Sequence, residues 1–337
     1  MTVEGASAPR ELGWRGPILA LLALTILPIT WLRVVTPIEQ SVVLLIPALA
    51  ACALVAWWNG GRAGLALVWV GLAVWTLTRP AVGASAHFDI LARGWSLIVA
   101  ACFGLVCCLG GTKAFFVRAL TAVAVALAIA AAVVVATRDS NVGDIVLTEL
   151  TRRSGRATAE FQAMLESSPR LTELIAQDTA AAAGAKGVVK LIEEGGVRAS
   201  SVFPALLGLE SLLILALAWA LFHRLSRVRI GAPLAPLKEF RFNDQLVWGV
   251  LLALTILWLP TLDMVRAAGW NLLLFFGGLY AVRGFGVLAW FLSPGRLALT
   301  IIVTLLLFMF PLLGALAFGL GLGDTWLDWR HRARPTT

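Results

Sequence analysis

The stretch VFPALLGLESLLILALAWALF, residues 202–222, decides the fold class, because Glu210 is its only charged residue. As an α-helix this stretch would be about 30 Å long, which is the thickness of the hydrocarbon core of a lipid bilayer. An apolar run of this length is typical of a transmembrane helix.

Similar apolar runs lie on both sides of this stretch and cover most of the chain. Of the 337 residues, 60% are hydrophobic and 14% are charged, against about 45–50% and about 25% in an ordinary soluble domain. The candidate spans are residues 17–32, 41–58, 63–78, 95–109, 115–136, 202–222, 246–259, 270–291 and 297–322. The sequence therefore predicts an all-α integral membrane protein, a polytopic bundle of eight or nine transmembrane helices embedded in the lipid bilayer.

The composition changes abruptly in the middle of the chain. Residues 138–200 hold eight basic and nine acidic residues, which are too many charges for hydrocarbon. Ser168 and Pro169 form a helix-start signature, and apolar residues recur at helical spacing on both sides of it. We predict an extramembrane hairpin of two amphipathic helices between an N-terminal bundle (residues 1–137) and a C-terminal module (residues 201–337). This hairpin either covers its own apolar stripes or acts as a lid or partner-docking arm.

The basic residues predict the orientation, since they concentrate in cytoplasmic loops. If the N-terminus is cytoplasmic, eleven basic residues lie on that side, namely Arg10, Arg15, Arg62, Lys113, Arg118, Arg224, Arg227, Arg229, Lys238, Arg241 and Arg296. Seven lie on the other side, namely Arg33, Arg79, Arg93, Arg266, Arg330, Arg332 and Arg334. The count favours a cytoplasmic N-terminus and an external segment 138–200, although the arginines of the C-terminal tail depart from the rule. The net charge of +8 is explained by the basic loop residues that orient the protein in the membrane. It therefore gives no reason to predict a nucleic-acid partner.

The second half of the chain resembles a known family in the order and spacing of four motifs. These are VFPALLGLESLLILALAWALFHRLSR at 202–227, PLKEFRFNDQLVW at 236–248, NLLLFFGGLYAVRGFGVLAWFL at 271–292 and GLGLGDTWLDWRHR at 319–332. Together they resemble the YybS-like family of uncharacterised bacterial multi-pass membrane proteins, and the weaker likeness of NGGRAGLAL at 59–67 extends toward the N-terminus.

This resemblance implies a multi-pass protein of the bacterial inner (cytoplasmic) membrane with no established activity. The N-terminal half of the family is similar to the substrate-binding membrane subunits of energy-coupling-factor uptake systems. Those subunits carry alanines four apart on the first helix for docking to a coupling partner. Here the first span offers only Gly16 with Ala20, and Ala20 with Ala23, so the chain departs from that pattern.

Two charged residues within the predicted spans are candidates for a functional site. Glu210 lies about 12 Å and Arg283 about 20 Å from the outer ends of helices that run in the same direction. Their side chains could therefore form an intramembrane pair lining a polar cavity that binds a solute or relays protons. Alternatively, Arg283 extends to the inner interface and Glu210 is protonated or bonded to a neighbouring helix. The glycines around Arg283 could let a ligand or another helix approach the backbone, and they are Gly277, Gly278, Gly284 and Gly286.

Two further clusters lie near predicted span ends. Asp324 and Asp328 share one face of a helix, with Trp326 and Trp329 beside them. Interfacial anchoring of the last span is a simpler interpretation of this cluster than acid–base chemistry. The basic group Arg224, Arg227 and Arg229 could contact anionic lipid or a cytoplasmic partner, or could serve orientation alone.

No motif of a soluble enzyme, a metal site or a cofactor site is present. The four cysteines all lie within apolar runs, and no two of the three histidines have metal-ligand spacing. We therefore expect no enzymatic activity, no metal and no cofactor. Two functions remain open: a solute-binding or transport subunit that works with membrane or cytoplasmic proteins, and a structural or assembly protein that scaffolds its partners.

Overall fold

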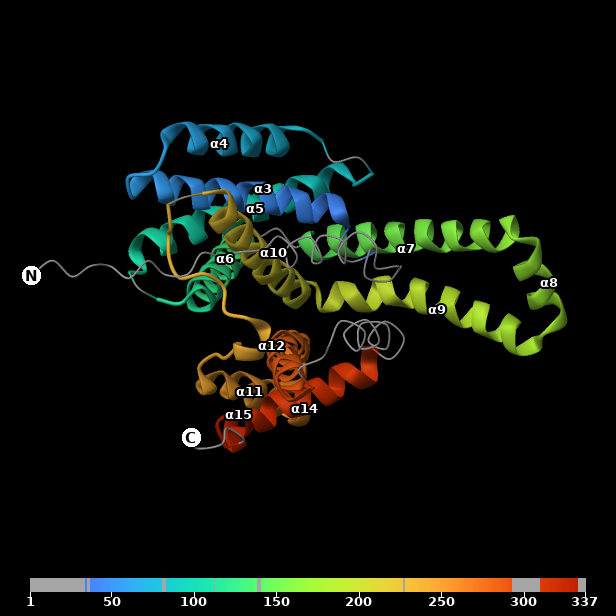
Figure 1. Ribbon diagram of the computed structural model, residues 1–337. Helices are drawn as coiled ribbons and strands as arrows, with labels where there is room; N and C mark the ends of the chain where they lie inside the picture. Colours follow the sequence, from blue (N-terminus) through green and yellow to red (C-terminus); the bar gives the residue numbers. More distant parts are fainter. Residues whose placement is uncertain are drawn as a thin grey trace, which may run out of the picture. The chain divides into compact units, whose positions relative to one another are not determined.

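A computed structural model describes residue 34 and residues 37–80, 83–111, 113–137, 141–226, 228–292 and 310–332 of the chain. Most of these residues are helical, and no strand occurs among them (Figure 1). The predicted all-α class is therefore confirmed for the described residues. The predicted span 17–32, the first part of the span 297–322 and Arg227 lie outside them.

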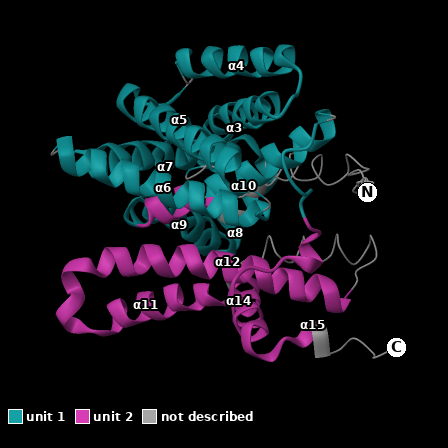
Figure 2. Cartoon of the chain, turned by 90° about the vertical axis from the view of Figure 1, so that its left-hand side faces the viewer, with its two compact units in different colours: residues 1–201, 210–234 teal, residues 202–209, 235–337 magenta. Residues whose placement is uncertain are grey.

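The chain divides into two compact units (Figure 2). Unit 1 consists of residues 1–201 and 210–234, and unit 2 consists of residues 202–209 and 235–337. The polar central segment thus belongs to the same unit as the N-terminal apolar helices.

Unit 1 contains the apolar helices α3 (Ile38–Trp58), α4 (Ala63–Thr78), α5 (Ala86–Leu109), α6 (Phe115–Thr137) and most of α10 (Phe203–Leu225). Helix α3 packs against α4 and α5, and α5 packs against α6. The turn between α3 and α4 requires glycine, because Gly60 has a φ of 86°. A Cβ on Gly61 would lie only 2.7 Å from the carbonyl oxygen of Ala56. This turn closes α3 and α4 into a tight hairpin.

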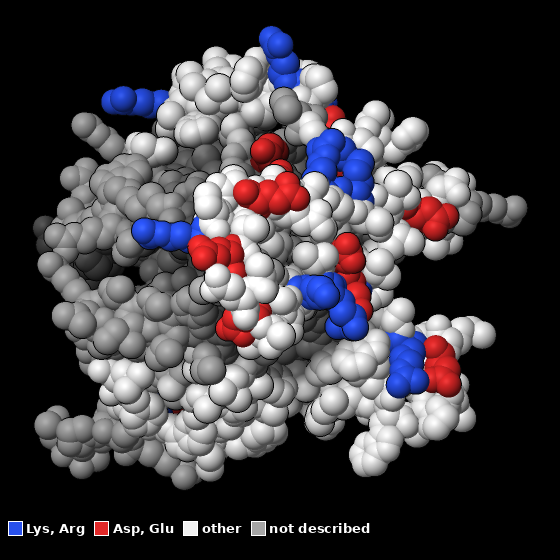
Figure 3. All heavy atoms as spheres, turned by 90° about the vertical axis from the view of Figure 1, so that its right-hand side faces the viewer, with Lys and Arg blue, Asp and Glu red and all other residues white. Residues whose placement is uncertain are grey.

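The polar segment forms an arm of three helices, α7 (Val142–Ser167), α8 (Pro169–Gln177) and α9 (Thr179–Ser201). Helices α7 and α9 pack along each other, with α8 at the far end of the hairpin (Figure 1). The sequence predicts two helices divided at Ser168 and Pro169, and the chain divides once more at Asp178, whose side chain accepts a hydrogen bond from the Ala180 amide at 2.8 Å at the start of α9. Viewed toward the side where the arm ends, acidic and basic side chains are interspersed on the surface (Figure 3).

Unit 2 contains α11 (Val247–Trp258), α12 (Arg266–Leu292), α14 (Phe310–Leu327) and α15 (Trp329–Arg332). Two short turns, η1 (Leu237–Glu239) and η2 (Asp244–Leu246), precede α11, and a third, η3 (Pro260–Val265), connects α11 to α12. Helix α12 packs against both α11 and α14. At the crossing of α12 and α14, a Cβ on Gly284 would overlap the Ala317 carbonyl, and one on Gly321 would overlap the Tyr280 carbonyl. Glycine at both positions therefore lets the two backbones touch.

Five stretches of the described residues are long and apolar enough to cross a membrane: α3, α5, α6, α10, and η3 with α12 from Pro260 to Leu292. Helices α4 and α14 and the η2–α11 stretch are apolar but shorter. Large apolar side chains such as Leu67, Val74 and Trp75 are exposed along α4, as expected of a surface covered by lipid. The structure therefore supports a membrane protein with several spans, and the predicted count of nine is not confirmed.

Candidate functional site

A cavity of 620 Å³ lies in unit 1, where the first turns of α3 and α5 meet the middle of α7. Its walls come from three segments that are far apart in the sequence. The apolar lining consists of Val34, Pro37, Val43, Gly83, Ala84, Phe88, Ala92, Ala157, Phe161 and Met164. The polar lining consists of Glu39, Gln40, Asp89, Arg153, Arg156 and Glu160. A mostly apolar wall with a few polar groups is typical of a small-molecule site.

Glu210 is joined to this cavity through Gln40. Glu210 is 8% exposed, and its carboxylate accepts hydrogen bonds from Ser41 Oγ at 2.9 Å and from Gln40 Nε2 at 3.1 Å. The other end of the Gln40 amide, Oε1, is buried and has no hydrogen-bond partner in the described structure. Gln40 as a residue lines the cavity, but this oxygen has almost no accessible surface and is therefore part of the packed wall.

A buried carboxylate fixes the root of the arm beside the cavity. Glu149 is fully buried, and it accepts hydrogen bonds from Arg152 Nη2 at 2.7 Å, from Arg153 Nε at 2.8 Å and from the Ser85 amide at 3.1 Å. Burial raises the pKa of Glu149, but these hydrogen bonds outweigh it and lower the pKa to about 2. Glu149 is therefore ionised at neutral pH.

The same network ties α7 to the loop before α5. The carbonyl of Gly83, whose φ is 89°, accepts hydrogen bonds from Arg156 Nη1 at 2.9 Å and from Arg152. The Arg153 guanidinium lies over the Phe88 ring, with its central carbon 4.6 Å from the ring centroid. These contacts hold the wall of the cavity that α7 contributes against the wall that α5 contributes.

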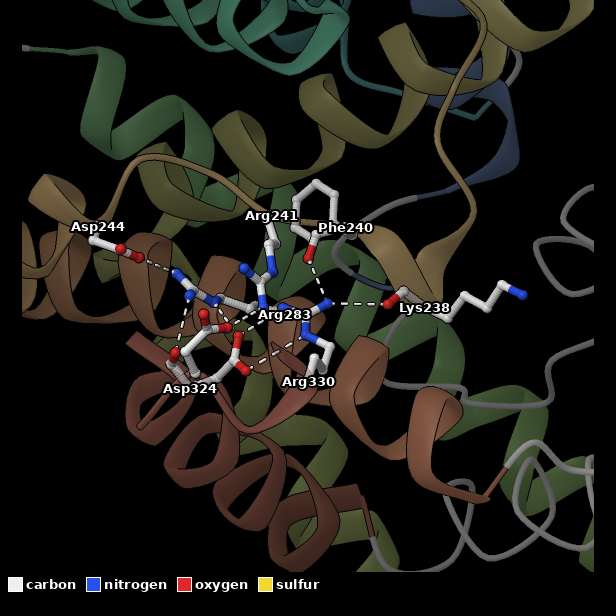
Figure 4. Close-up of polar contacts among 8 residues, drawn as sticks. Lys238, Phe240, Arg241, Asp244, Arg283, Asp324 and Arg330 are labelled. Atoms are coloured by element: carbon white, nitrogen blue, oxygen red, sulfur yellow. Dashed lines mark hydrogen bonds and ion pairs between the residues drawn. The ribbon is translucent and has the colours of Figure 1, made fainter. Parts of the chain in front are cut away.

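A second polar cluster lies in unit 2 and is centred on Asp324 (Figure 4). The fully buried Asp324 carboxylate accepts hydrogen bonds from Arg283 Nε at 2.9 Å and from Arg330 Nη2 at 2.6 Å. Arg283 Nη1 also pairs with Asp244 at 2.6 Å. Arg330 Nη1 donates to the carbonyl oxygens of Lys238 and Phe240 at 3.0 and 3.2 Å. The cluster thus fastens the loop before α11 to α12, to the C-terminal end of α14 and to α15.

Glu210 and Arg283, the two charged residues that the sequence singles out, each have their own partners within their own unit. Glu210 is bonded to neutral side chains of α3, and Arg283 is bonded to the aspartates of unit 2. Arg283 is 2% exposed. Both residues are therefore buried in polar surroundings.

The glycines near Arg283 mainly allow close packing within unit 2. A Cβ on Gly286 would meet the Leu237 carbonyl oxygen at 2.5 Å, and one on Gly278 would meet the Leu209 side chain at 2.9 Å. Gly277 is less crowded, with Phe318 at 4.0 Å, and Gly284 faces α14.

The Asp324 and Asp328 cluster separates into two environments. Asp324 is buried, whereas Asp328 lies at the surface and pairs with Arg241. Trp326 is exposed, and the Trp329 ring lies against Gly323. In the basic group, Arg224 donates to the Ala220 carbonyl at 2.8 Å, and Arg229 is exposed.

Several residues of both clusters are not singled out by the sequence. Gln40 and Ser41 are uncharged, so their position beside Glu210 leaves no sequence signal. Glu149 could have been found as the first member of a Glu-x-x-Arg-Arg pattern on one helix face, since residues three and four apart are neighbours.

A comparison with protein families matches residues 75–325 to the family described as "Predicted membrane protein (DUF2232)". No curated protein and no solved structure matches the chain. The match covers more than half of the chain and includes α5 to α12 and most of α14. The chain therefore belongs to the DUF2232 family of predicted membrane proteins.

Proposed function

We propose that this protein binds a small-molecule solute in the cavity of unit 1, as the membrane subunit of a transport system and not as an enzyme. The observation that carries the proposal is a cavity whose wall is mostly apolar and also carries a few polar side chains from α3, α5 and α7. The cavity volume of 620 Å³ lies within the range of about 300–1,000 Å³ that is usual for ligand sites.

The position of the cavity supports the same function. Its walls combine the ends of membrane helices with the arm, so that a solute would be held where the bilayer meets the aqueous phase. Glu210 lies behind Gln40, and a carboxylate at membrane depth is characteristic of solute and ion pathways. The arm would then form one side of the entrance.

We further infer a nine-span topology in the bacterial inner membrane, with the N-terminus cytoplasmic and residues 138–200 external. The count of basic loop residues supports this orientation. We also infer that the matched family is the YybS-like group, on the strength of the four motifs between residues 202 and 332.

Native mass spectrometry of the gently solubilised protein tests the binding function. The wild-type protein should carry a bound small molecule, and Ala92→Phe, which fills the cavity, should lose it. Ala86→Phe is the matched control, because Ala86 lies on the same helix, is exposed and does not line the cavity. A wild-type protein without any bound small molecule, or equal occupancy in both variants, would rule out this site.

A second candidate function is the scaffolding of partner proteins through the arm. Exposed apolar side chains on α9 favour it, since Val188, Leu191 and Val197 are 40%, 58% and 54% exposed. The same mass spectra separate the two functions. A protein partner that is lost in Leu191→Glu, together with an empty cavity, would support the scaffold and exclude the solute-binding function.

A further inference from the structure

Three apolar helices of unit 1 end at one place, which lies at the opposite end of α5 from the cavity. Helix α5 ends at Leu109, α6 begins at Phe115 and α10 ends at Leu225. Because each of these helices is long and apolar enough to cross a membrane, their shared end lies where the bilayer meets water. In the proposed topology this is the cytoplasmic side.

Arg118, in the first turn of α6, joins the two loops at this place. It is 2% exposed, and its Nη1 donates to the Ile230 carbonyl at 2.9 Å. Its Nη2 donates to the Gly111 carbonyl, and its central carbon lies 5.7 Å from the centroid of the Trp219 ring. The loop that follows α10 is therefore held against the loop between α5 and α6.

The basic side chains at this place have no acidic partner in the described part of the chain. Arg118 forms no ion pair there, and neither do Lys113 and Arg229, which are exposed on the two loops. The sequence has no Asp or Glu at positions 90–138 or 211–238. The two carbonyl groups solvate the Arg118 guanidinium but leave its net charge in place, so three positive charges act together at the surface.

Large apolar side chains are exposed on the same helix ends. Leu105 and Leu109 on α5 are 63% and 84% exposed, and Leu225 at the end of α10 is 50% exposed. A free inorganic anion would use only the charge of this surface. An anionic lipid would use both the charge and the apolar side chains, because its headgroup is joined to acyl chains.

We propose that this place binds the phosphate group of an anionic phospholipid. The phosphate oxygens accept hydrogen bonds from Lys113 and Arg229, and the acyl chains lie along the exposed leucines. Arg118 keeps the two loops adjacent, so that both donors reach the same headgroup. The sequence suggests lipid contact only for the basic group near the end of α10, and the structure adds Lys113 and Arg118.

Native mass spectrometry of the full-length protein in mild detergent measures this binding with two lipids. Dioleoylphosphatidylglycerol and dioleoylphosphatidylcholine have the same acyl chains, but the first is anionic and the second is zwitterionic. At equal concentrations, the phosphatidylglycerol should bind the wild-type protein about 10-fold or more tightly, because a basic residue near the membrane surface accounts for about 5-fold.

The double variant Lys113→Gln, Arg229→Gln should weaken binding of the phosphatidylglycerol by about 25-fold and leave the phosphatidylcholine unchanged. The matched control is Arg170→Gln with Lys186→Gln, which removes the same number of positive charges from exposed positions of the arm. This control should keep the preference for the anionic lipid. All four side chains are exposed, so both double variants should fold.

Equal binding of the two lipids by the wild-type protein, or the same loss in both double variants, would overturn the proposal. Displacement of the phosphatidylglycerol by an excess of inorganic phosphate would also overturn it, since the site would then recognise free phosphate. Ala92→Phe, which fills the cavity at the other end of α5, should keep the lipid preference. A failure of the solute-binding function is thus distinguishable from a failure of the lipid site.

Discussion

Neutralising Asp324 should destabilise unit 2 more than any other single charge change there. In Asp324→Asn, the buried guanidinium groups of Arg283 and Arg330, whose side chains are 3% and 5% exposed, lose their shared carboxylate. Among the ion pairs of the described residues, Arg283 keeps only that with Asp244, whose side chain is 59% exposed, and Arg330 keeps only neutral hydrogen-bond partners. Breaking a buried ion pair from one side costs about 3–5 kcal/mol, because the remaining charge is left without compensation.

Equilibrium unfolding of the purified protein in detergent, followed by tryptophan fluorescence, measures this loss. Asp328→Asn is the control, since the pair with Arg241 is 34% and 41% exposed and should contribute less than about 1 kcal/mol. Asparagine is the appropriate replacement, because the backbone at residue 328 has a φ of 40°, which Asn tolerates. Adding Arg330→Met to Asp324→Asn should recover about 1–3 kcal/mol. Equal stabilities of the two single variants, or a further loss in the double variant, would refute the reasoning.

Three further predictions concern the arm, the glycine crossing and the topology. The pKa of Glu149 in the folded protein lies below its unfolded value, so its stabilisation is complete above about pH 4.5 and is lost as the pH falls toward about 2. Glu149→Gln should therefore remove about 3 kcal/mol at pH 7 and make the arm more sensitive to limited proteolysis. Gly284→Ala should lower stability in the same unfolding assay by about 1–3 kcal/mol through overpacking, whereas Gly319→Ala, with open space at its Cβ position, should cost nothing. In a cysteine-free background, Glu166→Cys should react with a membrane-impermeant maleimide in intact cells and Asn59→Cys should not; the reverse pattern would invert the proposed orientation.

The helices follow closely from the sequence where hydrophobicity alone determines them. The predicted run 63–78 coincides with α4, and the predicted run 115–136 differs from α6 by one residue. These helices end near Gly or Pro residues, which stop a helix, or near Arg residues, whose charge must remain in contact with water. The arm is also predicted as helical with a division at Pro169, but its second division, at Asp178, is not predicted.

The candidate sites follow from the sequence only in part. The cost of burying a charge in hydrocarbon identifies Glu210 and Arg283 as residues with polar surroundings, and both are buried beside polar groups. The identity of those groups depends on how each helix is rotated, because a change of one residue turns a side chain by about 100°. The cavity has no sequence signature, since its walls come from segments separated by dozens of residues.

The cavity also constrains the topology in a way that the count of basic residues does not. Its walls are formed by residues 34–43, 83–92 and 153–164, so in the proposed topology these three segments lie on the same side of the membrane. Between the first and second segments the chain passes through α3 and α4, and a return to the same side requires an even number of crossings. If α3 crosses, as its length allows, then α4 crosses back, although it has only 16 residues, or about 24 Å of helix. The same reasoning applies to α5 and α6, which lie between the second wall segment and the arm. It supports counting all four helices as spans in the proposed topology.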